Sequence, residues 1–366
     1  MRKRFRTREE TMSKYRMMRS VAAGAFTAGA VAVAALSLSL TAGQAVAAEV
    51  TLRLHQMLPA QASVPKNILE PWMARIEEES GGRIEFQHFP AMQLGGKPPE
   101  LVDQAIDGIA DIVWTLPGYT PGRFPRTEVF ELPFVMTNAE AVSRAFWQLA
   151  EETMLDQDFK DMKVLGLWVH GPGLIHSKDP IDSLDDLNGV KLRAPTRVTN
   201  DMFSSLGATP VGMPVPAVPE ALSKGVIDAT VVPWEVTGAL KINELVSNHT
   251  DFGDDALYTA TFVLGMNRAA YDGLPDDLKA IIDKNSGLEL SGFAGGQMQR
   301  DDAKPRDEAI EKGATMIVLP PEEVARWKEA SAPTIEKWVA EMDEKGMDGT
   351  GLYKRAIELI EENTGK

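Results

Sequence analysis

Two series of short strands alternating with helices constrain the fold of this chain most strongly. From residue 49 to residue 115 the hydrophobic pattern predicts strand, helix, strand, helix, strand, and a second series begins after a sharp break at residues 170–173. Alternation of this kind is typical of α/β layers in which helices connect the strands of a sheet. From residue 275 onward the pattern is almost entirely helical. We therefore expect an α/β fold of two lobes, each a mixed sheet flanked by helices, with a cleft between the lobes and a helical C-terminal tail.

The individual elements follow from apolar periods of two residues for strands and about 3.6 residues for helices. The predicted strands lie at residues 49–54, 83–89, 110–115, 163–169, 190–193, 229–232 and 258–266. The predicted helices lie at residues 68–80, 100–107, 139–152, 199–206, 218–224, 276–286, 288–312, 322–345 and 352–362.

The start of the chain has the order of a secretory signal peptide. Residues 1–20 carry eight Lys or Arg and two Glu, residues 21–40 are apolar and rich in Ala, and Ala45-Val46-Ala47 provides a small-x-small cleavage pattern. This order predicts a leader over residues 1–47 that is cleaved after position 47 or 48, and a chain exported to the periplasm. The alternative is a retained membrane anchor, because the apolar run approaches the about 20 residues that span a bilayer. The Ser, Thr and Gly residues within the run favour cleavage.

The composition excludes several classes of site. A length of 366 residues suggests two domains, and the absence of Cys removes disulfides, thiolate zinc sites and cysteine nucleophiles together. Five scattered His offer little to a metal site, so neither a metal nor a cofactor is expected. Without the leader the chain has 30 basic and 51 acidic residues, a net charge of about −21. That charge argues against a nucleic-acid partner, because phosphate binding needs a basic surface.

No catalytic signature is found in the sequence. It lacks G-x-S-x-G, G-x-x-x-x-G-K-[ST], H-E-x-x-H and a G-x-G-x-x-G after a strand. Acid pairs such as Asp185-Asp186 stand at helix starts, where they interact favourably with the helix dipole. His170 and His176 are separated by Pro and Gly and make a weak metal pair. We therefore expect no catalytic step, and a secreted enzyme acting on organic acids is the alternative from another class.

Arg193 is the most promising binding residue. It closes a short apolar strand that begins at Val190 and is followed by Ala194-Pro195, so its side chain is expected at a strand end. Strand ends line the crevice in which α/β proteins bind ligands, and a guanidinium grips a carboxylate through two parallel hydrogen bonds. On spacing alone, the more common role is a surface Arg in an ion pair.

An ordered series of motifs resembles the solute-binding proteins of TRAP (tripartite ATP-independent periplasmic) transporters. The motifs follow the family's order from Leu52 to the helical tail. They are Ser80-Gly81-Gly82-Arg83-Ile84, Phe89-Pro90-Ala91-Met92-Gln93-Leu94-Gly95-Gly96, Asp107-Gly108-Ile109-Ala110-Asp111, Glu131-Leu132-Pro133-Phe134-Val135, Leu187-Asn188-Gly189-Val190-Lys191-Leu192-Arg193, Gly207-Ala208-Thr209-Pro210 and Gly225-Val226-Ile227-Asp228. Each is weak alone, but together and in order they are specific.

The resemblance implies a two-lobed periplasmic binding protein fold. Such a protein closes on an organic acid and delivers it to the membrane permease subunits without itself spanning the membrane. The expected division is lobe I over residues 48–170 and 258–297, and lobe II over residues 171–257 and 298–366. Arg193 falls on the family's carboxylate-gripping arginine.

Two departures from the family bear on the ligand. Relatives that bind sialic acid have a second arginine at the position aligned with Gly173 and an asparagine at the position aligned with Val232. A polyhydroxylated acid would leave its hydroxyl groups unpaired here. Aromatic residues at strand ends offer an apolar wall instead: Trp114 and Trp234 are assigned to ligand contact, and Trp168 to core packing.

The expected ligand is therefore a small monocarboxylate with an aromatic body, of benzoate type. The predicted ligand-binding residues are Arg193, Trp114, Trp234, Tyr119, His170, Val232 and Met213. His170, His176 or Tyr119 are candidates to bond ring hydroxyl groups, and Arg123 and Arg197 are candidates to attract the anion. Two alternatives stay open: a binder of an aliphatic keto acid or C4-dicarboxylate, and a ligand-sensing partner of a membrane receptor.

Overall fold

Two mixed sheets flanked by helices make up the part of the chain that the structure, a computed structural model, describes: residues 48–365. This arrangement confirms the predicted α/β class with a helical C-terminal region. The predicted signal peptide, residues 1–47, lies outside the described residues. No helix between residues 48 and 365 combines the length and the apolar character needed to cross a bilayer.

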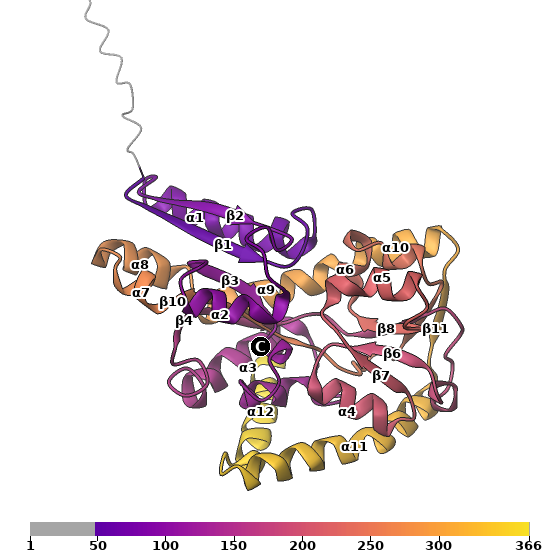
Figure 1. Cartoon of the computed structure of the whole chain (residues 1–366). Coiled ribbons are helices and arrows are strands. Elements are labelled where there is room, and N and C mark those ends of the chain that lie inside the picture. Colours follow the sequence, from indigo (N-terminus) through magenta and orange to yellow (C-terminus); the bar gives the residue numbers. More distant parts are fainter. Residues whose placement is uncertain (1–47, 366) are drawn as a thin grey trace, which may run out of the picture. The chain divides into compact units, whose positions relative to one another are not determined.

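The first sheet has the strand order β2-β1-β3-β10-β4 (Figure 1). Its strands are β1 (Val50–Gln56), β2 (Ile84–Phe89), β3 (Ile112–Thr115), β4 (Met162–Val169) and β10 (Thr261–Asn267). β1 is parallel to β2 and β3, whereas β10 is antiparallel to β3 and β4. β10 returns to this sheet after the chain has built most of the second one, so several segments connect the two sheets.

The second sheet has the strand order β11-β9-β5-β8-β6-β7. Its strands are β5 (Leu174–Ser177), β6 (Lys191–Ala194), β7 (Thr209–Gly212), β8 (Ala229–Val232), β9 (Asn248–Asp251) and β11 (Thr315–Val318). β6 is parallel to β7 and β8, and β5 is antiparallel to β8 and β9. The parallel pair β6–β8 places the ends of both strands at the same edge, where Arg193 and Val232 lie.

Helices cover both sheets. They are α1 (Glu70–Glu79), α2 (Leu101–Ile106), α3 (Ala139–Thr153), α4 (Arg197–Ser205), α5 (Val218–Ser223), α6 (Trp234–Ala239), α7 (Arg268–Asp272), α8 (Asp276–Lys284), α9 (Leu288–Asp301), α10 (Ala303–Glu311), α11 (Pro321–Glu344) and α12 (Gly349–Thr364). α3 packs against α9, α12 and β4, and the long α11 packs against α4 and then α12 (Figure 1). α11 thus connects a helix of the second sheet to a helix that covers the first.

Several elements differ from the sequence prediction. Strands β5, β7, β9 and β11 were not expected. Each has four residues, as the predicted β8 has, but none is an uninterrupted run of small and β-branched residues like Ala229–Val232. The long helical stretch predicted over residues 288–312 is present but divided: α9 ends at Asp301 and α10 begins at Ala303. Pro305 explains the interruption, because it has no N–H to bond the carbonyl of Asp301. The lobe boundaries given above stay a prediction.

Candidate functional site

A cavity lies where strands of both sheets end. The residues that line it are Met57, Leu58, Trp114, Leu116, Tyr119, His170, Arg193, Pro195, Val215, Val232, Pro233, Glu235, Val236, Tyr258, Ala260 and Phe262. The empty space among them is about 390 Å³, part of it open to solvent. Most of the lining is apolar or aromatic. Among these lining residues Arg193 is the only Lys or Arg, and Glu235 the only Asp or Glu.

Arg193 is only 2% exposed and is held by backbone carbonyl groups. Its Nε donates to the carbonyl oxygen of Met213 at 2.9 Å, and its Nη1 donates to that of Val231 at 3.1 Å. Both partners are neutral, so these bonds orient the guanidinium without compensating its charge. Nη2 is buried and has no hydrogen-bond partner among the described residues. The side chain therefore offers a fixed cation with a free donor to an anion in the cavity.

Two tyrosines lie beside this cation. The Tyr119 hydroxyl oxygen accepts a hydrogen bond from the backbone N–H of Val215 at 2.9 Å, which leaves the hydroxyl proton free to donate. Burial raises the pKa of Tyr119 and of Tyr258, and the positive charge of Arg193 opposes both shifts. Both phenols therefore stay protonated at neutral pH. Tyr119 can donate a hydrogen bond to the same anion that Arg193 attracts.

An aromatic wall forms one side of the cavity. Trp114 and Phe262 line it and stack with ring centroids 5.1 Å apart at an interplanar angle of 15°. Trp168 stacks on Trp114 from behind, at 6.4 Å and 11°, and is completely buried outside the lining. Its position agrees with the assignment of Trp168 to core packing. A flat aromatic ligand beside Trp114 would gain stacking energy beyond simple burial.

The two histidines considered as partners for ring hydroxyl groups have no free nitrogen. His170 lines the cavity, but its Nδ1 lies 2.5 Å from the Gly171 carbonyl oxygen and its Nε2 accepts from the backbone N–H of Ala260 at 3.0 Å. Burial lowers the pKa of His170 to about 4, so the ring is neutral. His176 lies outside the lining, with Nε2 bonded to the Val232 carbonyl and Nδ1 to His249. In this structure neither histidine has a ring nitrogen left to bond a ring hydroxyl group.

Two residues predicted to contact the ligand also lie outside the lining. Trp234 opens α6 and packs against His249 and His176, with ring centroids 4.6 and 4.9 Å away. β8 ends at Val232 and a helix begins at Trp234, so the alternation of a strand no longer determines where the indole points. Met213 acts through its backbone carbonyl, which orients Arg193. Val232 itself lines the cavity.

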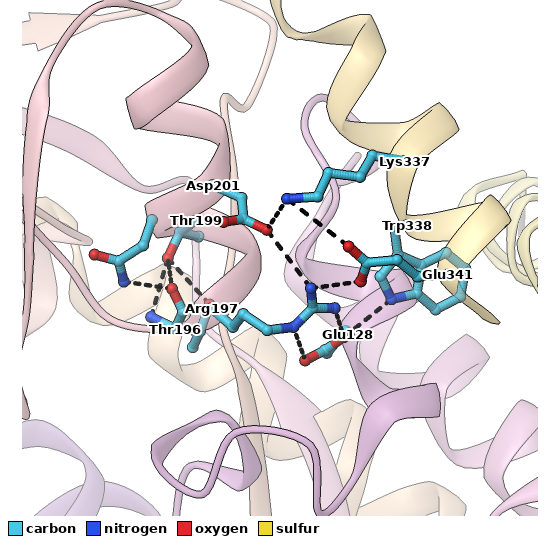
Figure 2. A network of polar contacts seen from close by, with 9 residues as sticks. Glu128, Thr196, Arg197, Thr199, Asp201, Lys337, Trp338 and Glu341 are labelled. Atoms are coloured by element: carbon cyan, nitrogen blue, oxygen red, sulfur yellow. Dashed lines mark hydrogen bonds and ion pairs between the residues drawn. The ribbon is translucent and has the colours of Figure 1, made fainter. Parts of the chain in front are cut away.

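The two other arginines considered for anion attraction are compensated by carboxylates. Figure 2 shows the bidentate pair of Arg197 with Glu128 and the contact of Arg197 with Glu341. Nε of Arg197 lies 3.1 Å from Oε1 of Glu128 and Nη2 lies 2.6 Å from Oε2, while Nη1 lies 2.7 Å from Oε2 of Glu341. Arg123 pairs with Asp103 at 2.6 Å. Neither offers a free charge to an anion. Arg197 instead ties α4 to the 3₁₀ segment Pro125–Glu131 and to α11, which fixes the chain that follows β6.

Tyr258 fills the space that a side chain at position 173 would need. A Cβ on Gly173 would lie within 3 Å of the ring atoms Cδ1, Cε1 and Cζ of Tyr258. The Gly173 N–H also donates to the Tyr258 carbonyl oxygen at 3.0 Å, so the two segments are in close backbone contact. Sequence reasoning missed Tyr258 as a lining residue because it placed position 258 inside a regular strand, whereas β10 begins at Thr261.

Two buried carboxyl groups near the cavity were also missed. Oε1 of Glu131 accepts from the backbone N–H and the hydroxyl of Thr261 at 3.1 and 2.7 Å, and its Oε2 is buried without a partner among the described residues. Burial raises the pKa of Glu131 to about 7 and that of Glu235 to about 7. A signal was available: each is the only charged residue in an otherwise uncharged eight-residue run, 129–136 and 229–236.

Comparisons with known proteins agree with this geometry. The family model described as bacterial extracellular solute-binding protein, family 7 (DctP), matches residues 55–342. A TRAP solute-binding protein from Rhodoferax ferrireducens T118, solved with copurified benzoate, is 50% identical, with a TM-score of 0.85 over 86% of this chain and 98% of that chain.

Two further relatives match over most of their length. A marine-metagenome TRAP solute-binding protein specific for aromatic acid ligands, solved with 3-hydroxybenzoate, is 46% identical, with a TM-score of 0.84 over 87% of this chain and 99% of that chain. The outer membrane transporter protein TsaT of Comamonas testosteroni is 28% identical over 82% of this chain and 88% of its own length.

Proposed function

This chain belongs to family 7 of the bacterial extracellular solute-binding proteins, as a TRAP solute-binding protein, and we propose that it captures a small aromatic monocarboxylate of benzoate type. The cavity around Arg193 is the proposed site. The proposal places the protein in the periplasm, where it hands the acid to the membrane subunits of a TRAP transporter, and it includes no catalytic step.

The observation that carries the proposal is a buried cation with a free donor in a cavity lined mostly by apolar and aromatic residues. Arg193 Nη2 and the Tyr119 hydroxyl proton supply donors for one carboxylate, and Trp114 and Phe262 supply flat apolar surface beyond it. Charge-assisted hydrogen bonds contribute about 1.5–3 kcal/mol each. Together with stacking and apolar burial, they are enough for a micromolar dissociation constant, about −8 kcal/mol.

The lining speaks against the aliphatic alternatives. A C4-dicarboxylate has a second charge that needs a second cation, and Arg193 is the only Lys or Arg among the lining residues. A polyhydroxylated acid needs several polar partners in the cavity. Both ring nitrogens of His170 are already hydrogen-bonded to backbone groups, and Val232 has no polar side chain. The benzoate and 3-hydroxybenzoate bound by the two similar TRAP proteins support an aromatic acid.

Isothermal titration of the purified protein tests the proposal. Benzoate is expected to bind with a dissociation constant in the micromolar range or below, and succinate about 100-fold more weakly, because its second carboxylate would be buried without a partner. N-acetylneuraminic acid should show no heat of binding. Tighter binding of succinate than of benzoate would contradict the proposed ligand class.

Ligand affinity is also expected to depend on pH through Glu131. Its carboxyl group is buried near Tyr119, Tyr258 and Glu128, and burial raises its pKa to about 7. Below pH 7 the group is mostly neutral and adds no negative charge beside Tyr119 and Tyr258. As pH rises through 7, Glu131 ionises and repels the bound anion, so affinity for benzoate should fall about three- to tenfold between pH 6 and pH 8.

Glu131→Gln should flatten that profile, because the amide stays neutral over the whole range. His170 does not contribute, since its pKa of about 4 lies below the range tested. Glu235→Gln serves as the comparison, because Glu235 lines the cavity and has a similar pKa, so the substitution that removes more of the pH dependence identifies the controlling carboxyl group. An unchanged pH profile in Glu131→Gln would show that another group controls the dependence.

A further inference from the structure

Glu235 is a carboxyl group in the cavity lining that carboxylate capture does not explain. It lies in the first turn of α6, directly after the lining residues Val232 and Pro233, and it is only 5% exposed. Its Oε2 accepts a hydrogen bond from the hydroxyl of Ser63. No hydrogen bond to its Oε1 is found among residues 48–365. A buried acid with one unused oxygen at a cavity is a polar site for a ligand group.

Glu235 and Arg193 line the same cavity but are held by different partners. Arg193 donates to the backbone carbonyl oxygens of Met213 and Val231, whereas the Glu235 carboxyl accepts from the hydroxyl of Ser63. A ligand whose carboxylate is bound at Arg193 can therefore meet Glu235 with another part of its body.

The position of the carboxyl is fixed from two sides. The backbone N–H of Glu235 donates to Oδ1 of Asp302 at 2.8 Å, which anchors the start of α6 to the junction between α9 and α10. Ser63 comes from the loop after β1, just before the helical turn Pro65–Leu69, and so belongs to the first-sheet side of the cavity. A group held in this way is preorganised and loses little entropy when a ligand binds.

We propose that Glu235, positioned by Ser63, hydrogen-bonds a hydroxyl group on the ring of the bound acid and makes this chain prefer hydroxylated aromatic acids over unsubstituted ones. This inference rests on the proposed function, because it presumes that the carboxylate is held at Arg193. A carboxyl group suits this role in either protonation state: its oxygens accept from a phenol, and the neutral form also donates. Burial and the charge of Asp301 raise the pKa of Glu235 to about 7, so both forms are populated near neutral pH.

The test compares benzoate with 3- and 4-hydroxybenzoate by isothermal titration. The wild-type protein should bind at least one hydroxybenzoate about five- to twentyfold more tightly than benzoate, as expected for one added hydrogen bond. Glu235→Leu should abolish that preference, so that benzoate and the hydroxybenzoates bind this variant with affinities within about threefold of one another. The matched control is Asp301→Asn. The carboxyl group of Asp301 lies outside the lining and accepts hydrogen bonds from Asn67 and Gln297. It should keep the preference.

The possible results separate the two proposals. If Glu235→Leu weakens benzoate and the hydroxybenzoates equally, the Glu235–Ser63 bond only joins the two sides of the cavity and the inference fails, although the proposed function stands. If the wild-type protein binds none of these acids, the proposed function fails. Should Glu235→Leu not fold, wild-type titration with 3- and 4-fluorobenzoate decides, because fluorine resembles hydroxyl in size but cannot donate. Equal affinity for fluoro and hydroxy analogues at both positions would overturn the inference.

Discussion

When Arg193 is replaced by Met, a side chain of similar length without charge, titration calorimetry should no longer detect benzoate binding. The substitution removes the cation and the charge-assisted hydrogen bonding that Nη2 offers to the ligand, so we expect affinity to fall by about 100-fold or more, ~3 kcal/mol. Screening by salt does little to reduce this effect, because Arg193 is buried. The measurement is titration with benzoate at pH 6 and pH 7.

Arg193→Lys distinguishes charge from geometry. Lysine keeps the positive charge but cannot bond the carbonyl oxygens of Met213 and Val231 while it also presents a fork to the ligand. We expect it to recover only part of the affinity, with a loss of about tenfold against the wild type. A value near the wild type would show that the bidentate geometry contributes little.

The matched control is Arg197→Lys. Arg197 lies four residues further along the chain, and its guanidinium is occupied by Glu128 and Glu341 (Figure 2). Its substitution should lower the melting temperature but leave benzoate affinity within about threefold. If Arg193→Met stays folded by circular dichroism and retains benzoate affinity within about twofold, Arg193 is not the carboxylate-binding residue.

Arg193 shows which kind of inference the sequence supports well. A short apolar strand that ends in Arg-Ala-Pro places the side chain at a strand end, and strand ends in α/β folds meet at one edge. The structure puts Arg193 there, beside the end of β8. The same logic located Trp114, at the end of β3. Regular elements with clear periods therefore predicted both the fold class and the position of the cation.

Irregular segments limited the prediction. Trp234 also follows a strand, but Pro233 and the start of α6 intervene, and the direction of a side chain at such a junction depends on backbone angles that the residue pattern does not encode. Tyr258 reaches the cavity only because Gly173, 85 residues earlier in the chain, leaves room for its ring. Contacts between residues so distant in sequence depend on tertiary packing, which local propensity does not determine.

The pairing of Gly173 with Tyr258 gives the second large expected effect. Gly173→Ala places a methyl group within 3 Å of three Tyr258 ring atoms, a distance that real side chains do not tolerate. The backbone at Gly173 is not in the left-handed region, so the clash and not strain decides the outcome. Tyr258 is enclosed by His170, with an edge-to-face centroid distance of 5.4 Å, and by Gly173 itself. The Tyr258 ring can therefore move only into the cavity, which reduces the space left for the ligand.

We expect Gly173→Ala to cost about 1–3 kcal/mol of stability, the usual range for overpacking a core, and to weaken benzoate binding about tenfold or more. A thermal melt and a benzoate titration measure the two effects. The family resemblance implies an arginine at this position in relatives that bind sialic acid, and a side chain of that size would overlap the Tyr258 ring of this chain.

A double-mutant cycle tests whether the clash is the cause. Tyr258→Ala alone should destabilise by about 3–5 kcal/mol, because it leaves a cavity where the ring was. In the double variant with Gly173→Ala the added methyl meets empty space, so it should cost no further stability and give an interaction energy of about 1–3 kcal/mol. Additive losses in the double variant would mean that Gly173 is required for a reason other than the ring. A benzoate affinity unchanged in Gly173→Ala would show that Tyr258 yields away from the ligand, so that its phenol does not shape the site.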